Sequence, residues 1–570
     1  MLPLPRDNAQ QKATCPMSSS FSQRTATTLL FCGLLTLLSA TRALAERPLQ
    51  DPPNDVRAFA RPHVVPVLVR NRWNVVLELT IHVELSQASR TLQDVELSLG
   101  GSLDLEDIEK VDVIASTLPQ RSWTNVGNLN RHQDLSLFGD AQPQSTSNTI
   151  HVRGSAKLQQ GVNHFFVSVK ITDQADMSKT LQIECPAVTI DGQTHQLKST
   201  GPTASLRLGY ALRRAGDDGV HTYRIPGLAT TKAGSLIAVY DVRYDSNRDL
   251  PADIDVGMSR SVDGGRSWEP MRIIMDMGNE LKWHGDGIGD PTVLVDPIRG
   301  TIWVAAIWSH GNRAWRHSGP GLRPEETGQF VLVRSDDDGK TWSNPINITN
   351  QVKDPQWNLV FNGPGKGICL QDGTLVFPAQ FQDKNRVPHS TIVYSLDRGR
   401  TWKIGTGAHL QTTEAQVVEY RPGELMLNCR YNLAASRVVM TTKDLGASWE
   451  EHPSSQKALI EPRACMASLI AVDEPSGDES TDVEPPDRWL LFSNPNSTRA
   501  RENITIKASS DGGHSWPQAH QLLLDQGRGA GYSCMTMIDK DTIGILYEGS
   551  TSQLVFQRIP LLDVIETSYR

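Results

Sequence analysis

The chain has 570 residues, with 56 Lys and Arg against 64 Asp and Glu, a formal net charge of −8 and 38% hydrophobic residues. This composition is typical of a folded protein of at least two domains, and it excludes a disordered chain, a collagen and a polytopic membrane protein. The negative net charge gives no general basic field for nucleic acid. Seven Cys without a CxxC pair predict neither a disulfide scaffold nor a zinc framework.

The first 45 residues have the pattern of an export signal. A polar leader with three basic residues precedes an apolar stretch at 26–40, and the small-x-small sequence Ala43-Leu44-Ala45 follows. The apolar stretch is short for a bilayer span. We therefore predict that residues 1–45 are a signal peptide, that the protein is secreted or periplasmic, and that it has no membrane span.

Residues 46–203 have the sequence pattern of a β-sandwich. Short β-rich runs are separated by Pro, Asn, Asp and Gly, as expected for strands joined by turns. No acid, base or metal-ligating residues converge there in the sequence, so we expect an accessory or scaffold domain rather than a catalytic one. The runs lie at 64–69, 75–83, 164–171 and 187–190.

An eight-residue motif recurs five times in residues 204–570. Its copies begin 47 to 74 residues apart, and a β-rich run such as 330–333 or 391–394 precedes each copy. Repeats at this spacing, flanked by strands, predict the blades of a β-propeller. The copies are SVDGGRSW (261–268), SDDDGKTW (335–342), SLDRGRTW (395–402), TKDLGASW (442–449) and SSDGGHSW (509–516).

The residue types of this motif favour a structural turn. Asp can accept hydrogen bonds from N–H groups of its own turn, Gly tolerates a positive φ, and Trp can bury a large ring between neighbouring sheets. A calcium loop at 336–339 is not supported, because no Glu stands at loop position 12. We call each copy of this motif an Asp box, and we predict no metal site from these boxes. They indicate the fold but not what the protein does, because fold does not fix function.

Two further motifs point to a family. Together with the five boxes, HTYRIPG (221–227) and GYSC (531–534) resemble the bacterial-type exo-α-sialidases (neuraminidases) with Asp-box, or BNR, repeats. The resemblance covers about residues 205–560. It implies an all-β fold, a six-bladed β-propeller preceded by a β-sandwich, with the active site at the propeller axis.

The resemblance also implies three arginines that bind the carboxylate of sialic acid. A guanidinium binds a carboxylate through two parallel hydrogen bonds and keeps its charge. Arg224 in YRIP and Arg430 in LMLNCRYN match the first two. Arg499 and Arg501 are both candidates for the third, and Arg501 is preferred because it directly precedes the expected strand at 504–507.

The nucleophile of this family is a tyrosine, which sets sialidases apart from most glycosidases. A carboxylate nucleophile would be repelled by the carboxylate of the substrate, whereas a phenol can approach neutral and lose its proton to a partner carboxylate. Tyr532 in GYSC matches the nucleophile, and Glu414 in TTEAQV matches its base.

The remaining site residues follow from the same resemblance. Asp249 fits the position of the acid/base better than Asp245 does, although the neighbouring Arg248 is a cation that would keep an acid ionised. The resemblance assigns the substrate-binding residues Arg243, at the polar edge of the sugar, Asp290, at the ring substituents, and Glu548, as the carboxylate that orients Arg224.

Taken together, the sequence predicts a secreted, retaining exo-α-sialidase that releases terminal sialic acid from glycoproteins, glycolipids and oligosaccharides. The expected route has a tyrosyl–sugar intermediate and requires no cofactor. A trans-sialidase, or a glycosidase of a related keto-sugar acid, would use the same residues. A non-catalytic sialoglycan-binding propeller is the alternative from another class, and the presence of Tyr532, Glu414, Asp249 and the arginines argues against it.

Overall fold

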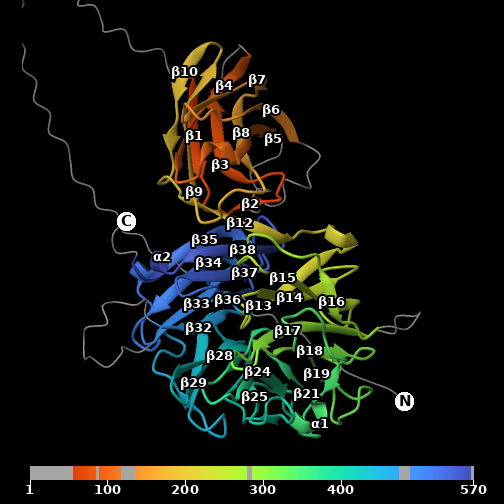
Figure 1. Ribbon diagram of the computed structural model, residues 1–570. Coiled ribbons are helices and arrows are strands. Elements are labelled where there is room, and N and C mark those ends of the chain that lie inside the picture. Colours follow the sequence, from red (N-terminus) through yellow and green to blue (C-terminus); the bar gives the residue numbers. More distant parts are fainter. Residues whose placement is uncertain (1–54, 85–88, 117–134, 279–285, 474–487, 567–570) are drawn as a thin grey trace, which may run out of the picture. The chain divides into compact units, whose positions relative to one another are not determined.

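The computed structural model describes residues 55–84, 89–116, 135–278, 286–473 and 488–566. The predicted signal peptide at 1–45 lies outside these residues. Strands dominate the described chain, and its helices are short (Figure 1). Within this part of the chain, no helix has the length and apolar character needed to cross a bilayer. The helical segments are η1 (Leu105–Asp107), η4 (Asp217–Gly219), α1 (Thr349–Val352), η5 (Gln518–His520) and α2 (Leu562–Ile565).

Residues 56–199 form two packed groups of β-strands, coloured red to yellow in Figure 1. Alternating apolar residues of both groups, such as Leu79, Val95 and Val167, are fully buried in one core, as expected for a sandwich. The first sheet runs β11 (Lys198–Ser199), β1 (Val56–Pro62), β3 (Val75–Val83), β8 (Gly161–Ile171), β5 (Ile108–Ser116), β6 (Leu135–Ala141); the second contains β10 (Gln193–Gln196), β9 (Thr180–Ile190), β4 (Arg90–Gly101) and β7 (Thr149–Leu158).

The rest of the described chain forms a succession of antiparallel sheets, each built largely from strands that follow one another in sequence. The first three are β13 (Thr222–Thr230), β14 (Leu236–Arg243), β15 (Ile254–Ser261) and β16 (Arg272–Met275); β17 (Gly287–Val295), β18 (Ile302–Ser309), β19 (Gln329–Ser335) and β20 (Ile346–Asn347), with β22 (Gly365–Lys366) beside β17; and β21 (Leu359–Asn362), β23 (Ile368–Cys369), β24 (Leu375–Gln382), β25 (Pro388–Ser395), β26 (Lys403–Ile404) and β27 (His409–Leu410).

The next two sheets are β28 (Thr412–Arg421), β29 (Glu424–Tyr431), β30 (Arg437–Thr442) and β31 (Glu450–Glu451), and β32 (Ser468–Val472), β33 (Trp489–Pro495), β34 (Glu502–Ser509) and β35 (Gln521–Arg528). A last group contains β36 (Ser533–Met537), β37 (Thr542–Tyr547) and β38 (Leu554–Pro560). Strands β13, β17, β24, β28, β32 and β36 contact one another in this order, and β36 contacts β13. In the described chain, six sheets therefore close into a ring, in agreement with the expected propeller.

The last sheet of the ring is completed by a strand that precedes the first sheet in the sequence. Strand β12 (Leu206–Arg213) pairs with β38 and so becomes the fourth strand of the last sheet. The other edge of β12 pairs with β2 (Val67–Val69) in parallel and, at Leu206 and Arg207, with β9. The sandwich and the propeller are thus joined by continuous strand pairing.

The five Asp boxes occupy equivalent turns. Each begins with the last residue of a third strand: β15, β19, β25, β30 or β34. In the third box, Asp397 accepts hydrogen bonds from Thr401 N (2.8 Å), Thr401 Oγ1 (2.6 Å) and Ser395 Oγ (2.9 Å). These bonds lower the pKa of Asp397 to about 2. The other four boxes repeat the same bonds.

Candidate active site

A cavity of about 430 Å³ gathers most of the predicted site residues. They come from loops and strands of several sheets, which places them at the centre of the ring. Arg243 and Glu548 lie directly behind them and bind them. The predicted residues that line the cavity are Arg224, Asp249, Asp290, Glu414, Arg430, Arg501 and Tyr532.

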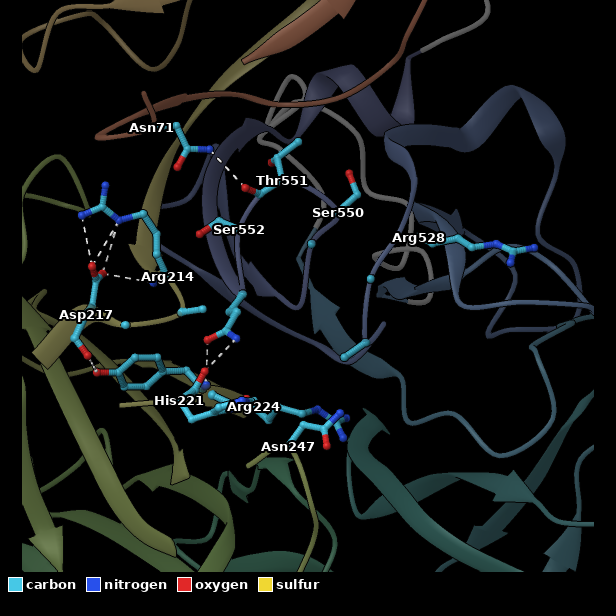
Figure 2. A pocket seen from close by; sticks show the side chains of 18 of the residues that line it. Asn71, Arg214, Asp217, His221, Arg224, Asn247, Arg528, Ser550, Thr551 and Ser552 are labelled. Atoms are coloured by element: carbon cyan, nitrogen blue, oxygen red, sulfur yellow. Dashed lines mark hydrogen bonds and ion pairs between the residues drawn. The ribbon is translucent and has the colours of Figure 1, made fainter. Parts of the chain in front are cut away.

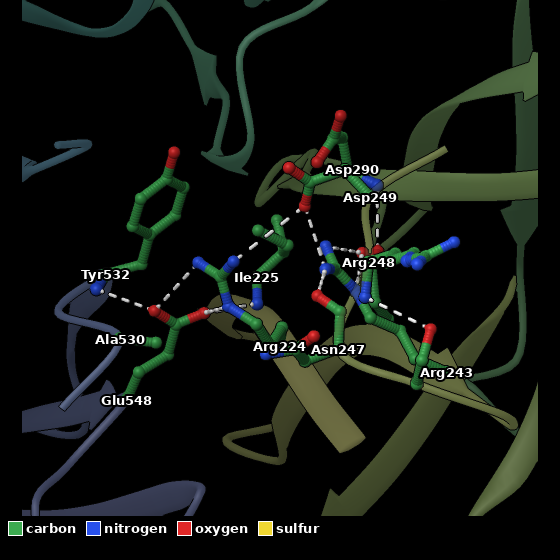
Figure 3. A network of polar contacts seen from close by, with 12 residues as sticks. Arg224, Ile225, Arg243, Asn247, Arg248, Asp249, Asp290, Ala530, Tyr532 and Glu548 are labelled. Carbon is green, nitrogen blue, oxygen red and sulfur yellow. Dashed lines mark hydrogen bonds and ion pairs between the residues drawn. The ribbon is translucent and has the colours of Figure 1, made fainter. Parts of the chain in front are cut away.

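Arg224 is fixed by Glu548. Its Nε and Nη2 donate to the two carboxylate oxygens of Glu548 at 2.9 and 3.2 Å (Figure 3). The same carboxylate accepts the backbone N–H groups of Ile225 (2.8 Å) and Tyr532 (2.9 Å). Although burial opposes it, the charge of Arg224 lowers the pKa of Glu548. One buried carboxylate thus holds an arginine and the backbone that carries Tyr532.

Tyr532, Glu414 and Arg430 form a second cluster. Tyr532 Oη lies 2.8 and 2.7 Å from the two carboxylate oxygens of Glu414 and accepts a bond from Arg430 Nη1 at 2.9 Å. Arg430 Nη1 also donates to Glu414 at 2.6 Å. Burial and the charge of Glu414 raise the pKa of Tyr532 well above its usual value, so the phenol is neutral in the free protein.

Arg501 lies against the ring of Tyr532. Its guanidinium carbon is 5.2 Å from the ring centre, the same distance as that of Arg224. Its two terminal nitrogens donate to Ala464 O and Ala530 O, each at 2.7 Å. Arg499, the other candidate, is exposed. The structure thus brings Arg501, and not Arg499, into the cavity.

Buried donors around Tyr532 remain available to a ligand. Arg430 Nε is buried and has no hydrogen-bond partner among the described residues. Within the described chain, the guanidinium of Arg501 donates to two carbonyl oxygens, which carry no charge to offset its own. Three guanidinium groups around one phenol form a site suited to a carboxylate.

Asp249 lies at the open side of the cavity. Its side chain is 78% exposed, and its Oδ1 lies 2.8 Å from Arg243 Nη1 and 3.8 Å from Arg224 Nη1 (Figure 3). Partial desolvation raises the pKa of Asp249, but the charges of Arg243 and Arg224 outweigh it and lower the pKa. The cations that act on this acid are therefore Arg243 and Arg224, rather than the neighbouring Arg248.

Asp290 is held by a residue that the sequence did not single out. Asp241, on β14, accepts two bonds from Arg243 and the N–H of Asp290 at 2.8 Å. Asp290 has φ = 56°, so its backbone is strained and needs such support. Burial, followed by the charges of Asp241, Glu414 and Asp249, raises the pKa of Asp290 well above its usual value.

The cavity also has an apolar wall that the motifs did not reveal. It is formed by scattered residues whose spacing in the sequence carries no signal, because they come from separate loops and strands. Trp315 packs edge-on against Phe361, with ring centres 6.1 Å apart. The wall residues are Leu250, Pro251, Ile307, Ala314, Trp315 and Phe361.

A larger cavity, of about 820 Å³, has a different character (Figure 2). Several of its polar groups are already bonded to one another: Asn71 donates to Thr551 O at 3.2 Å, and Arg214 is paired with Asp217 at 3.1 Å. It shares Arg224 with the smaller cavity, but its phenol, Tyr223, donates to the backbone carbonyl of Asp217 at 2.8 Å and contacts a single carboxylate oxygen of Asp218 at 3.5 Å. Tyr532, in the smaller cavity, instead contacts both oxygens of one carboxylate. The smaller cavity is therefore the candidate active site. Across the described residues, no cluster of three metal-ligating side chains occurs.

The ring of sheets, its box turns and the central cavity define a BNR-repeat β-propeller. A family description, "N-terminal domain of BNR-repeat neuraminidase", matches residues 56–194, and another, "BNR repeat-like domain", matches residues 234–545. The chain is 43% identical to a sialidase of Bacteroides fragilis over 528 residues, 89% of this chain and 95% of that one. It belongs to the BNR-repeat neuraminidase, or sialidase, family.

Solved structures agree with this assignment. A Hadza microbial sialidase superposes with a TM-score of 0.81 at 41% identity, covering 89% of this chain and 100% of that one. An intramolecular trans-sialidase of Ruminococcus gnavus, at 18% identity and a TM-score of 0.53 over 62% of this chain and 97% of that one, shares the fold.

Proposed function

We propose that this sialidase is a retaining exo-enzyme that releases terminal α-linked sialic acid through a tyrosyl–sugar intermediate. The observation that carries the proposal is the contact of Tyr532 Oη with both carboxylate oxygens of Glu414, beneath three guanidinium groups. A phenol with a carboxylate at hydrogen-bonding distance is a nucleophile with its base.

The three arginines support an anionic sugar as substrate. Arg224, Arg430 and Arg501 surround the Tyr532 ring and hydroxyl. A carboxylate on the anomeric carbon would bind to these groups and so place that carbon above the phenol oxygen. Because the cavity is small and closed behind by Glu548, it fits a terminal residue, which is the basis for exo cleavage.

In the first displacement, Tyr532 Oη forms a bond to the anomeric carbon while its proton passes to Glu414. The glycosidic bond breaks, and the leaving oxygen takes a proton from Asp249. Asp249 is ionised in the free protein, but a bound substrate carboxylate would offset the charge of Arg224 and raise the pKa of Asp249. This effect allows the group to act as an acid.

In the second displacement, water attacks the anomeric carbon and Asp249 accepts its proton. The bond to Tyr532 breaks, and the phenolate recovers its proton from Glu414. Two displacements at one carbon retain the anomeric configuration. Asp290, whose pKa burial and the neighbouring carboxylates raise, would bind the polar substituents of the sugar. Arg243 lies behind the cavity and would act at the polar edge of the sugar through Asp249, to which it is bonded at 2.8 Å. No step requires a cofactor.

The proposed substrates are sialylated glycoproteins, glycolipids and oligosaccharides. We also propose that the protein is exported, because residues 26–45 carry an apolar stretch and a small-x-small site. Export would bring the enzyme to glycans outside the cytoplasm.

The phenol is tested by Tyr532→Phe, with Tyr240→Phe as the control. Both variants remove one oxygen from a buried ring: Tyr532 is 4% and Tyr240 0% exposed. The hydroxyl of Tyr240 bonds Arg213 (2.8 Å) and Ser259 (2.7 Å) outside the cavity. We expect Tyr532→Phe to lose kcat by orders of magnitude on a chromogenic sialoside, and Tyr240→Phe to retain it.

The covalent step is tested by inactivation with a 2,3-difluorosialic acid, which slows the second displacement. Mass spectrometry of a digest should then find the adduct on the peptide that contains Tyr532. Inactivated enzyme with the adduct on another peptide would overturn the tyrosyl intermediate. NMR should show the α anomer as the first free product, and the β anomer would overturn retention.

A further inference from the structure

An ion pair that the catalytic steps do not use lies behind the cavity. Arg437, on β30, and Glu461 are 0% exposed at their side chains, and Arg437 Nη1 lies 2.5 Å from Glu461 Oε2. Burying two charges is costly and rarely adds net stability compared with apolar side chains. Such a pair is therefore better explained by what it holds in place.

Arg437 connects three parts of the chain. Its Nη1 also donates to Cys465 O at 3.0 Å, while its Nε and Nη2 donate to Asn428 Oδ1 (2.7 Å) and Asn428 O (3.0 Å). One guanidinium thus binds both ends of the segment 461–465 and fixes it to β29. The segment includes Ala464, whose φ of 66° is unusual for a residue with a Cβ and has to be maintained by its surroundings.

The segment 461–465 reaches two carboxylate-binding arginines. The carbonyl oxygen of Ala464, adjacent to the one that Arg437 holds, accepts a bond from Arg501 Nη2 at 2.7 Å. At the other end, Glu461 Oε1 accepts the backbone N–H of Tyr431, the neighbour of Arg430, at 3.4 Å. Arg501 is held by carbonyl oxygens, so its position follows the position of the peptide groups that carry them.

We propose that Arg437 and Glu461 are positioning residues that set the place of Arg501, and through Tyr431 that of Arg430, in the carboxylate-binding site. The inference rests on the proposed function, because it takes these two arginines as ligands of the substrate carboxylate. It predicts that a change at Arg437 weakens binding of the anionic ligand although Arg437 itself is buried behind the cavity.

Arg437→Lys tests this directly. The variant keeps a positive charge beside Glu461, but one ammonium group cannot span Glu461, Cys465 O and Asn428 together. Arg260→Lys is the matched control: Arg260 is 8% exposed and is bonded to Glu269 (2.7 Å) and Asp338 at the outer turns. We expect Arg437→Lys to weaken binding of the sialidase inhibitor DANA about tenfold by calorimetry, and Arg260→Lys to leave it unchanged.

A double-mutant cycle tests whether Arg437 affects DANA binding through the position of Arg501. Residues that act through one another are not additive, so Arg437→Lys should weaken DANA binding less once Arg501→Ala is present, and the remaining loss is the contribution through Arg430. Additive losses would overturn the route. Binding as tight as in the wild type, with a lower Tm, would show that the pair only stabilises the fold and would overturn the proposal.

Failure of the variant to fold and failure of the proposed function can each be distinguished from failure of this inference. If Arg437→Lys does not fold, the double variant Glu461→Gln/Arg437→Met, which leaves no unpaired buried charge, supplies the same measurement: weaker binding supports the proposal, and wild-type binding overturns it. If wild-type protein does not bind DANA, or Arg501→Ala binds it unchanged, the proposed function fails, and with it the basis of the inference.

Discussion

Two arginines separated by a single residue have different environments. Arg501 lies at the Tyr532 ring and binds two carbonyl oxygens, whereas Arg499 is exposed. The motif alone left both as candidates for the third carboxylate ligand. The difference arises because residues 502–509 form β34, which fixes the direction of the side chain immediately before it.

We expect Arg501→Ala to impair catalysis and Arg499→Ala to have a small effect. A charge-assisted hydrogen bond contributes about 1.5–3 kcal/mol, so kcat/KM should fall about tenfold to over a hundredfold in Arg501→Ala. Steady-state kinetics on a small sialoside, with Tm as the folding control, provide the measurement. A crippled Arg499→Ala beside a fully active Arg501→Ala would reverse the assignment.

The residues proposed to contact the ligand could be predicted because family motifs mark them, and the structure places most of them around one cavity. Of the residues behind them, Arg243 and Glu548 could also be predicted from the resemblance, but others could not. Asp241 and the pair of Arg437 and Glu461 stand in strands or loops without a local signature. Their roles depend on which distant backbone groups they meet, such as Asp290 N and Cys465 O, and sequence spacing does not encode those contacts.

At the scale of elements, the Asp box is a turn whose Trp joins neighbouring sheets. Trp402, 3% exposed, packs edge-on against Trp303 of the preceding sheet, with ring centres 5.9 Å apart, and beside Phe377 at 5.4 Å. The sequence pattern was sufficient to predict these turns because the repeated hydrogen bonds of the central Asp are made to residues two and four positions away. Trp449, at the same position of the next box, is only partly buried.

Trp402→Ala should therefore lower stability while sparing the chemistry. Removing a buried aromatic ring costs about 3–5 kcal/mol, and the cavity residues do not include Trp402. Trp449→Ala, the control, should cost less because its ring is less buried. Chemical denaturation gives the free energy of unfolding, and kcat per folded molecule gives the activity. An unchanged Tm with lost turnover would contradict this separation.

At the scale of the whole molecule, the strand that completes the last sheet of the ring is itself paired with a strand from the N-terminal region. The repeat predicted five box-bearing sheets; the last sheet has no box and is completed by β12, which precedes the first box-bearing sheet. Parallel pairing of β2 with β12 had no sequence signal, because β2 is short and distant in the chain. Leu68 of β2 is fully buried in the same core as Ile545 and Val555 of the last sheet.

We expect a shortened protein beginning at residue 204 to hydrolyse small sialosides, but with a lower Tm than the full chain. All residues that line the catalytic cavity follow residue 204, so the chemistry should persist. The shortened protein lacks β2, which leaves one edge of β12 unpaired and removes Leu68 from the core.

Leu68→Ala in the full chain isolates the packing contribution. Truncating a buried Leu costs about 2–5 kcal/mol, and this variant keeps the sandwich and all site residues. If loss of packing explains the effect of shortening, both proteins should show a lower Tm and a normal kcat per folded molecule. A shortened protein that is folded and inactive, beside an active Leu68→Ala, would instead show that the sandwich supplies groups needed for catalysis.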